Sequence, residues 1–420
     1  MIVIRGGEAL APGGWVTADV SIDADRVAGV GSGLSGNVEI DAVGCLVGPG
    51  FVDMHTHLRE PGQTWKEDIA SASRAAVAGG FTAITAMPNT DPPMDSPKVV
   101  ESVLSSARQI GLVEVLAAGS LTEGRAGAVP NDIEGLYRVG VRLFTDDGDS
   151  VADRAVLEAV MKQIAALPGA VLAQHAEDSS LTEGGQMHEG VMSRRLGIEG
   201  MPSRAETDVV ARDLELAART GVHYHCQHVS ASQTVELIRD AKKAGLAVTA
   251  EVTPHHLSFD DSFLAGLDAD FKMYPPLRGD GDRLALIDGL RSEVIDVVAT
   301  DHAPHLREEK QVAFRDAPRG VIGLETAAAA TWMALEDRDR FFSSLSTRPA
   351  EILGLGHQGR AIRPGAPANL VVFDPSAEWV ADRFRSKSSN SPHQGRKMKG
   401  QVRATVHGGE VVYHSEEDQR

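Results

Sequence analysis

The chain has 420 residues, enough for one large α/β barrel with an appended domain. Hydrophobic residues make up 42% and charged residues 24%, which excludes a disordered chain, and the two cysteines exclude a disulfide framework. The formal net charge of −18 argues against a nucleic-acid-binding surface, so an anionic substrate would have to be attracted by a local cation.

Short β segments mark both ends of the chain. They are rich in β-branched side chains, are separated by Gly-rich turns, and span residues 2–4, 15–22, 27–30, 369–373 and 401–407. Because similar segments lie on either side of a different middle, we expect one small β-sandwich domain built from residues 1–48 and 358–420.

Between residues 49 and 357, eight short apolar runs alternate with segments that mostly have helix length and helical spacing of apolar residues. The runs are 51–54, 82–86, 113–117, 141–144, 171–173, 223–226, 247–252 and 296–299. Eight such alternations predict a closed parallel (β/α)8 TIM-like barrel. An open doubly wound sheet is the alternative, but no Gly-x-Gly-x-x-Gly follows a first strand.

Polar residues gather where the predicted strands end, which is where the βα loops of a barrel converge. His55 and His57 are two residues apart on a strand, so their side chains point to the same face. A single buried histidine is usually a core residue, but a group of buried imidazoles and carboxylates costs free energy unless it is paired or metal-bound. The candidate metal ligands, enough for two ions sharing one carboxylate, are His55, His57, Asp147, His175, His228 and Asp301.

Two assignments within this set rest on local pattern. Of the pair Asp146 and Asp147, we favour Asp147 as the ligand and Asp146 as its structural neighbour in a turn. If the strand at 223–226 is regular, its two histidines face the helix layer, whereas Cys226 shares the face of His228 one layer deeper.

The motifs at these positions resemble the amidohydrolase superfamily and, within it, the type I dihydroorotases. They are DMHTHLREPG (53–62), AMPNTDP (86–92), FTDDG (144–148), HAED (175–178), EVTPHHL (251–257) and ATDHAPH (299–305). The resemblance implies a zinc-dependent cyclic amide hydrolase that reversibly cyclises N-carbamoyl-L-aspartate to (S)-dihydroorotate plus water, the third step of de novo pyrimidine biosynthesis. Metal-bound hydroxide would be the nucleophile.

The same resemblance implies a role for each ligand. One zinc ion would be held by His55, His57 and Asp301 and a second by His175 and His228, with Asp147 as the bridging carboxylate. Asp301 would also be the general acid and base. The implied substrate contacts are Arg59, Asn89, Tyr274, His305, Arg319 and Gly320.

Two of these positions depart from the family pattern. Tyr274 stands where the family usually has Asn before PPLR, and Arg319 stands where the loop commonly reads Ala-Pro-Phe-Gly. Both lie in or beside the substrate site, and the long polar segment 306–322 is expected to close over that site.

Two other functions remain open on the sequence. The chain could be another amidohydrolase, such as a hydantoinase, dihydropyrimidinase or allantoinase, or a non-catalytic scaffold subunit for aspartate carbamoyltransferase. Arg59 favours a substrate with a free carboxylate, because a guanidinium matches a carboxylate bidentately. The scaffold relatives have lost metal ligands, whereas this sequence keeps a full set.

The last expectations concern location and partners. The first residues lack the basic and apolar segments of a signal peptide, and the most apolar stretch, 326–335, is shorter than the ~20 residues of a membrane span. We therefore expect a cytoplasmic enzyme with a small-molecule substrate and neither a membrane nor a nucleic-acid partner. The family resemblance adds a homo-oligomer, a dimer, and an association with aspartate carbamoyltransferase.

Overall fold

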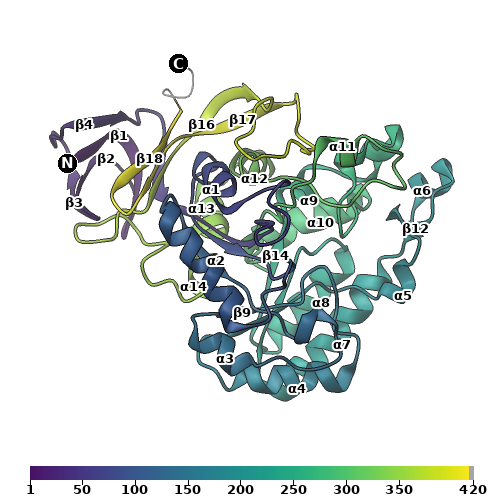
Figure 1. The fold of residues 1–420 in the computed structure, drawn as a ribbon. Helices are drawn as coiled ribbons and strands as arrows, with labels where there is room; N and C mark the ends of the chain where they lie inside the picture. Colours follow the sequence, from purple (N-terminus) through teal and green to yellow (C-terminus); the bar gives the residue numbers. More distant parts are fainter. Residues whose placement is uncertain (416–420) are drawn as a thin grey trace.

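The structure, a computed structural model, describes residues 1–415. Within this range the chain forms an α/β barrel and a sheet built from both chain ends (Figure 1). In Figure 1 the purple N-terminal strands and the yellow C-terminal strands lie together at one end of the molecule, and the helices surround the barrel.

Eight parallel strands within residues 1–415 form the barrel. They are β6 (Phe51–Thr56), β7 (Phe81–Ala86), β8 (Glu114–Ala117), β9 (Leu143–Phe144), β10 (Val171–Gln174), β13 (His223–Cys226), β14 (Val248–Val252) and β15 (Val297–Val298). Hydrogen-bond ladders run from β6 through β7 to β8, and from β9 through β10, β13 and β14 to β15. Two single parallel bridges, Gly119–Phe144 and Thr56–His302, join these two groups of strands and close the ring. The expected barrel is confirmed.

A helix follows each barrel strand on the outside. In α2 (Pro97–Ile110), the buried Val100, Val103 and Ala107 recur at helical spacing, and Gly111 ends the helix in the left-handed region at φ 67°. The other seven are α1 (Ile69–Ala78), α3 (Ile133–Arg138), α4 (Arg154–Ala165), α7 (Arg204–Thr220), α8 (Ser232–Lys243), α10 (Asp280–Arg291) and α12 (Ala327–Leu335).

Shorter elements lie in the connecting loops and after the last barrel helix. They are η1 (Glu123–Arg125), α5 (Ser179–Thr182), β11 (Met187–His188), α6 (Val191–Leu196), β12 (Gly200–Met201), α9 (Pro254–Ser258), η2 (Asp261–Gly266), η3 (Ala269–Phe271), α11 (Arg307–Lys310), α13 (Arg338–Phe342), η4 (Ser343–Thr347) and α14 (Arg348–Ile352). Most follow β10, β14 and β15, so the loops at the carboxyl ends of these strands are long enough to form walls around a site.

The terminal strands form one continuous sheet around their own core. They are β1 (Ile2–Ala11), β2 (Gly14–Asp23), β3 (Arg26–Gly31), β4 (Val38–Asp41), β5 (Leu46–Pro49), β16 (Leu370–Val380), β17 (Lys397–His407) and β18 (Glu410–His414). The order is β18-β17-β16-β5-β1-β2-β3, and β4 pairs with β1. The β-rich domain from both chain ends is thus confirmed, while its boundaries at 48/49 and 357/358 stay a prediction.

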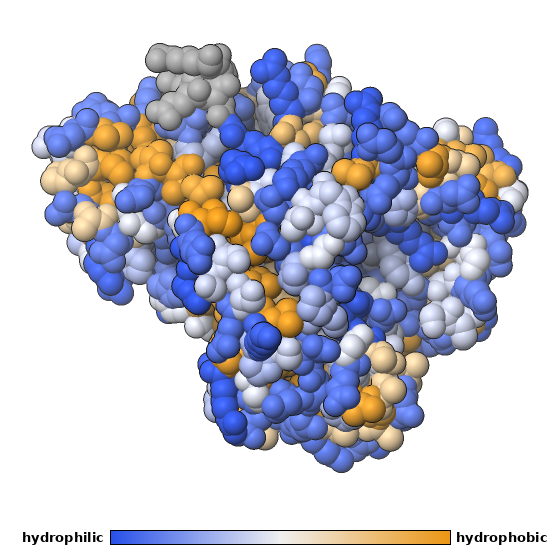
Figure 2. Space-filling view, in the orientation of Figure 1, coloured by the Kyte–Doolittle hydropathy of each residue, from blue (hydrophilic) through white to orange (hydrophobic). Residues whose placement is uncertain are grey.

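An apolar layer fills the barrel beneath the carboxyl ends of its strands. It includes Val52, Ala83, Leu143, Val171 and Val297. The face of the molecule drawn in Figure 2 is mostly hydrophilic, with apolar residues most evident over the terminal sheet. Among residues 1–415, none of the helices combines the length and the apolar character needed to cross a membrane.

Candidate active site

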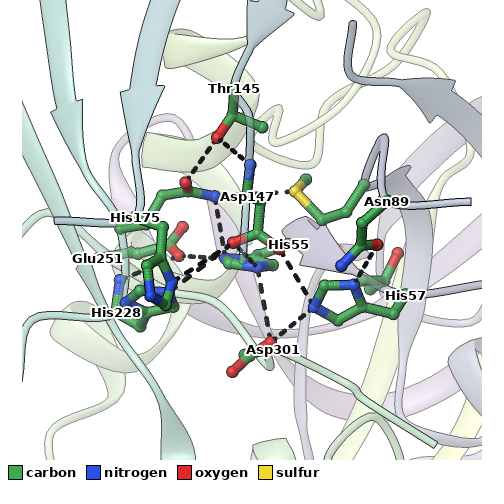
Figure 3. A network of polar contacts seen from close by, with 12 residues as sticks. His55, His57, Asn89, Thr145, Asp147, His175, His228, Glu251 and Asp301 are labelled. Carbon is green, nitrogen blue, oxygen red and sulfur yellow. Dashed lines mark hydrogen bonds and ion pairs between the residues drawn. The ribbon is translucent and has the colours of Figure 1, made fainter. Parts of the chain in front are cut away.

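The six predicted metal ligands come together above the apolar layer of the barrel (Figure 3). They lie on or just beyond the carboxyl ends of five strands, β6, β9, β10, β13 and β15, and all six side chains are buried. These residues are far apart in the sequence, and closure of the barrel brings them together.

Asp147 lies at the centre of the cluster. Its Oδ1 is 3.1 Å from His55 Nε2, and its Oδ2 is 3.4 Å from His57 Nε2. The same Oδ1 is 3.8 Å from His228 Nε2 and 4.0 Å from His175 Nδ1. Two groups of potential metal ligands therefore share this one carboxylate.

Asp301 contacts His55 and His57 from the opposite side. Its Oδ1 is 2.9 Å from His57 Nε2 and 3.5 Å from His55 Nε2. Its Oδ2 accepts no hydrogen bond from any residue in the range 1–415. Burial raises the pKa of the Asp301 carboxyl, but the two imidazoles outweigh burial and bring the pKa below its usual range. Asp301 is therefore a carboxylate with one oxygen free to accept a proton.

The donor atoms fit a metal ion better than a hydrogen-bond network. His55 Nε2 is buried and has no hydrogen-bond partner, although Asp147 is close to it. His175 Nδ1 faces His228 Nε2 at 2.8 Å, and burial together with His228 lowers the pKa of His175 to about 3, so its imidazole is neutral. Imidazole nitrogens beside buried carboxylates are the nitrogen and oxygen donors that zinc prefers.

A residue that the sequence analysis did not single out, Glu251 of β14, lies directly behind the cluster. Its Oε1 is 2.6 Å from His55 Nδ1 and also accepts the backbone N–H of His228 at 3.2 Å. This contact occupies His55 Nδ1 and leaves Nε2, which faces Asp147, as the nitrogen available to a metal ion. A lone carboxylate within an apolar strand, as at 247–252, was the signal that could have identified it.

Replacing Glu251 with Gln is expected to weaken metal binding, measured with zinc, about 10- to 100-fold, the usual cost of losing a partner that orients a ligand. A neutral amide holds the His55 Nδ1–H less firmly than a carboxylate does. Competition with a chromogenic chelator measures the affinity. Thr249→Val is the control, because it removes the contacts of Thr249 Oγ1 to His225 and His223 at 2.8 and 2.9 Å but leaves the contact between Glu251 and His55 in place. Equal zinc affinity in Glu251→Gln and wild type would contradict this role.

The predicted orientation of the histidines in β13 was wrong. His225 is buried with Nε2 3.1 Å from Glu251 Oε2, so it faces the barrel interior beneath His55. Tyr224 faces the helix layer, where its hydroxyl donates to Asp213 of α7 at 3.2 Å, and Cys226 packs in the same cluster. The alternation fails because His228 has φ 29°, which breaks the strand geometry before its side chain enters the site.

Three predicted site residues have left-handed backbone conformations: Arg59 at φ 58°, His228 at φ 29° and Asp301 at φ 47°. Such a conformation costs a non-glycine residue of order 1–3 kcal/mol. Around Asp301 the strain is compensated by buried hydrogen bonds, because Thr300 donates from its Oγ1 and its backbone N to Asp53 at 2.6 and 3.1 Å.

Asp146 and Asp147, for which we expect different roles, make different contacts. Asp146 turns away from the histidines, and its Oδ1 accepts the backbone N–H groups of Leu121 and Thr122 at 2.8 and 3.2 Å. Asp146 therefore fixes the loop after β8, while Asp147 faces the cluster.

A cavity of about 210 Å³ opens above the cluster. All six predicted substrate contacts line it, together with five of the six candidate ligands, namely Arg59, Asn89, Tyr274, His305, Arg319, Gly320, His57, Asp147, His175, His228 and Asp301. Asn89 also accepts a 2.8 Å hydrogen bond from His57 Nδ1, which leaves His57 Nε2 facing the carboxylates. The sixth ligand, His55, lies beneath the cavity floor.

The segment 306–322 covers one side of the cavity and is held by groups that the sequence analysis did not identify. Lys310 donates from Nζ to the carbonyls of Pro318 and Gly320 at 3.0 and 2.9 Å, and Asn390 donates to Gly320 O at 3.1 Å. Gly320 itself has φ 117°, and a Cβ there would lie 2.8 Å from Ala303 Cβ. These contacts fix the segment over the site; a closing motion stays a prediction.

Comparisons with known proteins agree with this arrangement. A family model described as Dihydro-orotase-like matches residues 44–234. The chain is 43% identical to a dihydroorotase of Mycobacterium tuberculosis over 427 residues, covering 98% of each chain. It is 40% identical to a dihydroorotase of Caldanaerobacter subterraneus over 422 residues, covering 98% of this chain and 97% of the relative.

Among solved structures, an L-hydantoinase (dihydropyrimidinase) from Arthrobacter aurescens has the same fold. Its TM-score is 0.88 at 24% identity, with 98% of this chain and 96% of that chain covered. The fold alone is thus shared with enzymes of other names, whereas sequence identity above 40% extends over nearly the whole of relatives named dihydroorotase. The chain belongs to the dihydroorotase family.

Proposed function

We propose that this protein is a zinc-dependent dihydroorotase that reversibly cyclises N-carbamoyl-L-aspartate to (S)-dihydroorotate and water, the third step of de novo pyrimidine synthesis. The observation that supports this most strongly is one small cavity with a cluster of histidines around a shared carboxylate and a guanidinium at its edge. The full-length relatives named dihydroorotase support the same activity.

We assign two zinc ions to the cluster. His55, His57 and Asp301 would hold one and His175 and His228 the other, with Asp147 between them. Bound zinc would supply hydroxide near neutral pH and polarise the amide carbonyl. The donor set supports this assignment, because it combines four imidazoles, that of His175 being neutral, with carboxylates that stay ionised.

Asp301 moves the proton in this proposal. During hydrolysis its free Oδ2 accepts a proton from the attacking water and returns it to the ring nitrogen as the carbon–nitrogen bond breaks. In the cyclisation direction the same oxygen takes a proton from the ureido nitrogen. A carboxylate held by His57 at 2.9 Å keeps the fixed position that such a transfer needs.

The substrate's free carboxylate is assigned to Arg59, Asn89 and His305. Arg59 Nη2 lies 3.5 Å from His305 Nε2, and its Nε donates to Pro304 O at 3.2 Å, so the guanidinium is held at the cavity edge. Burial, with Arg59 and Lys66 close by, lowers the pKa of His305 far below its usual range, so that imidazole is neutral. Arg59 then carries the positive charge that recognises the carboxylate.

Replacing Arg59 with Ala is expected to raise KM for N-carbamoyl-L-aspartate about 10- to 100-fold, because hydrogen bonds to charged groups are worth ~1.5–3 kcal/mol. Steady-state kinetics in both directions measure the change. An unaltered KM would mean that the carboxylate is not bound there.

Turnover of dihydroorotate and of 5,6-dihydrouracil by the purified protein tests the proposed activity. The second compound has the same cyclic amide without the carboxylate. We expect turnover of dihydroorotate and little of dihydrouracil. The reverse preference would favour a dihydropyrimidinase, the class to which the structural neighbours belong.

Location and assembly complete the proposal. We place the enzyme in the cytoplasm as a homodimer, and we keep the association with aspartate carbamoyltransferase as a prediction. Light scattering of the purified protein, alone and mixed with that enzyme, tests both statements.

A further inference from the structure

One side of the cavity is formed by two side chains that depart from the family pattern, Tyr274 and Arg319, which we name the Tyr274–Arg319 wall. Both residues line the cavity. The Arg319 guanidinium carbon lies 4.4 Å from the centre of the Tyr274 ring, a cation–π distance. The two departures therefore form one unit.

Tyr274 is fixed between the metal cluster and a buried carboxylate. Its ring lies against the His175 ring with centroids 4.7 Å apart. Its hydroxyl donates to Glu177, which also accepts from Thr182. Burial and Glu177 raise the pKa of Tyr274, so the hydroxyl stays protonated and neutral. The aromatic face is thus presented beside His175 in a fixed orientation.

Both the backbone and the guanidinium of Arg319 are held by hydrogen bonds. Nη2 donates to Gly185 O at 2.6 Å, while the backbone carbonyl of Arg319 accepts from His305 Nε2 at 2.9 Å. Within residues 1–415 the guanidinium has no carboxylate within ion-pair distance. Glu177 lies on the other side of Tyr274 and does not line the cavity. Burial raises the pKa of the Glu177 carboxyl and Arg319 acts to lower it, so this carboxylate offsets part of the charge from behind Tyr274. None of the described carboxylates that line the cavity pairs with the guanidinium, so the side of the cavity next to His175 carries a positive charge.

The two substrates of the proposed reaction differ by one negative charge. N-carbamoyl-L-aspartate has two carboxylates. On ring closure the ureido nitrogen bonds to the carbon of one carboxylate, a proton is taken up and water leaves, so dihydroorotate keeps a single carboxylate. Arg59 can pair with the carboxylate that both share. A second fixed cation favours the open form, because only the open form has a second carboxylate.

We propose that the Tyr274–Arg319 wall is a specificity determinant that selectively strengthens binding of the dianionic open substrate over the monoanionic ring. This inference rests on the proposed function and deepens it: Arg59 recognises the carboxylate common to both substrates, and Arg319 recognises the carboxylate that reacts.

The test is the effect of Arg319→Met on the two KM values measured separately. Met keeps the unbranched apolar part of the side chain and removes the charged guanidinium. We expect KM for N-carbamoyl-L-aspartate to rise about 10- to 100-fold, the loss typical of a charged hydrogen-bonding group, and KM for dihydroorotate to rise much less. Arg319→Lys should recover most of the difference. Arg108→Met, on the exposed face of α2, controls for the loss of overall charge.

The kinetic constants of every variant can be checked for consistency. The ratio of kcat/KM in the two directions must equal the equilibrium constant of the reaction, which no variant changes. Equal changes in both KM values, or no change in either, would overturn the proposal.

If Arg319→Met lowers the thermal midpoint, the double variant Tyr274→Asn/Arg319→Phe is measured in its place. It restores the residue types usual in the family and should give the same selective rise in KM for N-carbamoyl-L-aspartate. If wild type turns over neither substrate, the proposed function itself fails, which is a distinct result.

Discussion

Replacing Asp301 with Asn is expected to remove nearly all turnover while leaving the fold intact. The amide cannot accept a proton at the position of the free Oδ2, and positioned proton transfer is worth about 10²–10⁴-fold in rate. Asn suits the φ of 47° at this position, because it tolerates the left-handed region better than most residues. Steady-state turnover of dihydroorotate measures the loss.

Two readouts separate this chemical role from a structural one. The thermal midpoint of Asp301→Asn should stay near wild type, because the hydrogen bonds that hold this turn run between Thr300 and Asp53. Metal content measured on the same sample shows how much of the loss comes from a weakened site. Normal turnover in this variant would exclude Asp301 as the acid and base.

Replacing Asp147 with Ala is expected to remove bound zinc more completely than the loss of any one histidine. Asp147 is the only residue common to both groups of potential ligands in the described part of the chain, so its loss affects both. We expect zinc affinity to fall by more than about 100-fold, since the loss of an orienting partner alone costs up to that amount. Elemental analysis after gel filtration measures the retained metal.

The neighbouring carboxylate provides a matched control for this prediction. Asp146→Asn keeps an oxygen for the backbone N–H groups of Leu121 and Thr122 and does not touch the histidines. It should lower the thermal midpoint modestly and leave the zinc content near wild type. Equal zinc content in Asp147→Ala and wild type would mean that the shared carboxylate does not hold the metal.

The barrel could be predicted because each of its strands is an apolar run between two polar loops. Even β9, which has only Leu143 and Phe144 in the ladder, was recognisable from the run at 141–144. The ligands could be found for a related reason. A histidine or aspartate directly after an apolar run stands out in the sequence, because the preceding residues of the strand are apolar.

What could not be predicted depends on backbone conformation and on contacts across the barrel. No sequence pattern marks the left-handed φ of His228, and the regular alternation assumed for β13 therefore gave the wrong face for His225. Glu251 and Asn390 act on residues far away in the chain, at His55 and Ala303, and Lys310 acts across its own loop on Gly320. Such pairings appear only when the strands and loops are placed in space.

The most direct test of the central claim combines dihydroorotate turnover with metal analysis on one purified sample. Turnover and zinc content are measured as isolated, after treatment with a chelator, and after zinc is restored. We expect turnover that is lost with the metal and recovered with it. Turnover that persists in metal-free protein, or metal-loaded protein that leaves dihydroorotate unchanged, would contradict it.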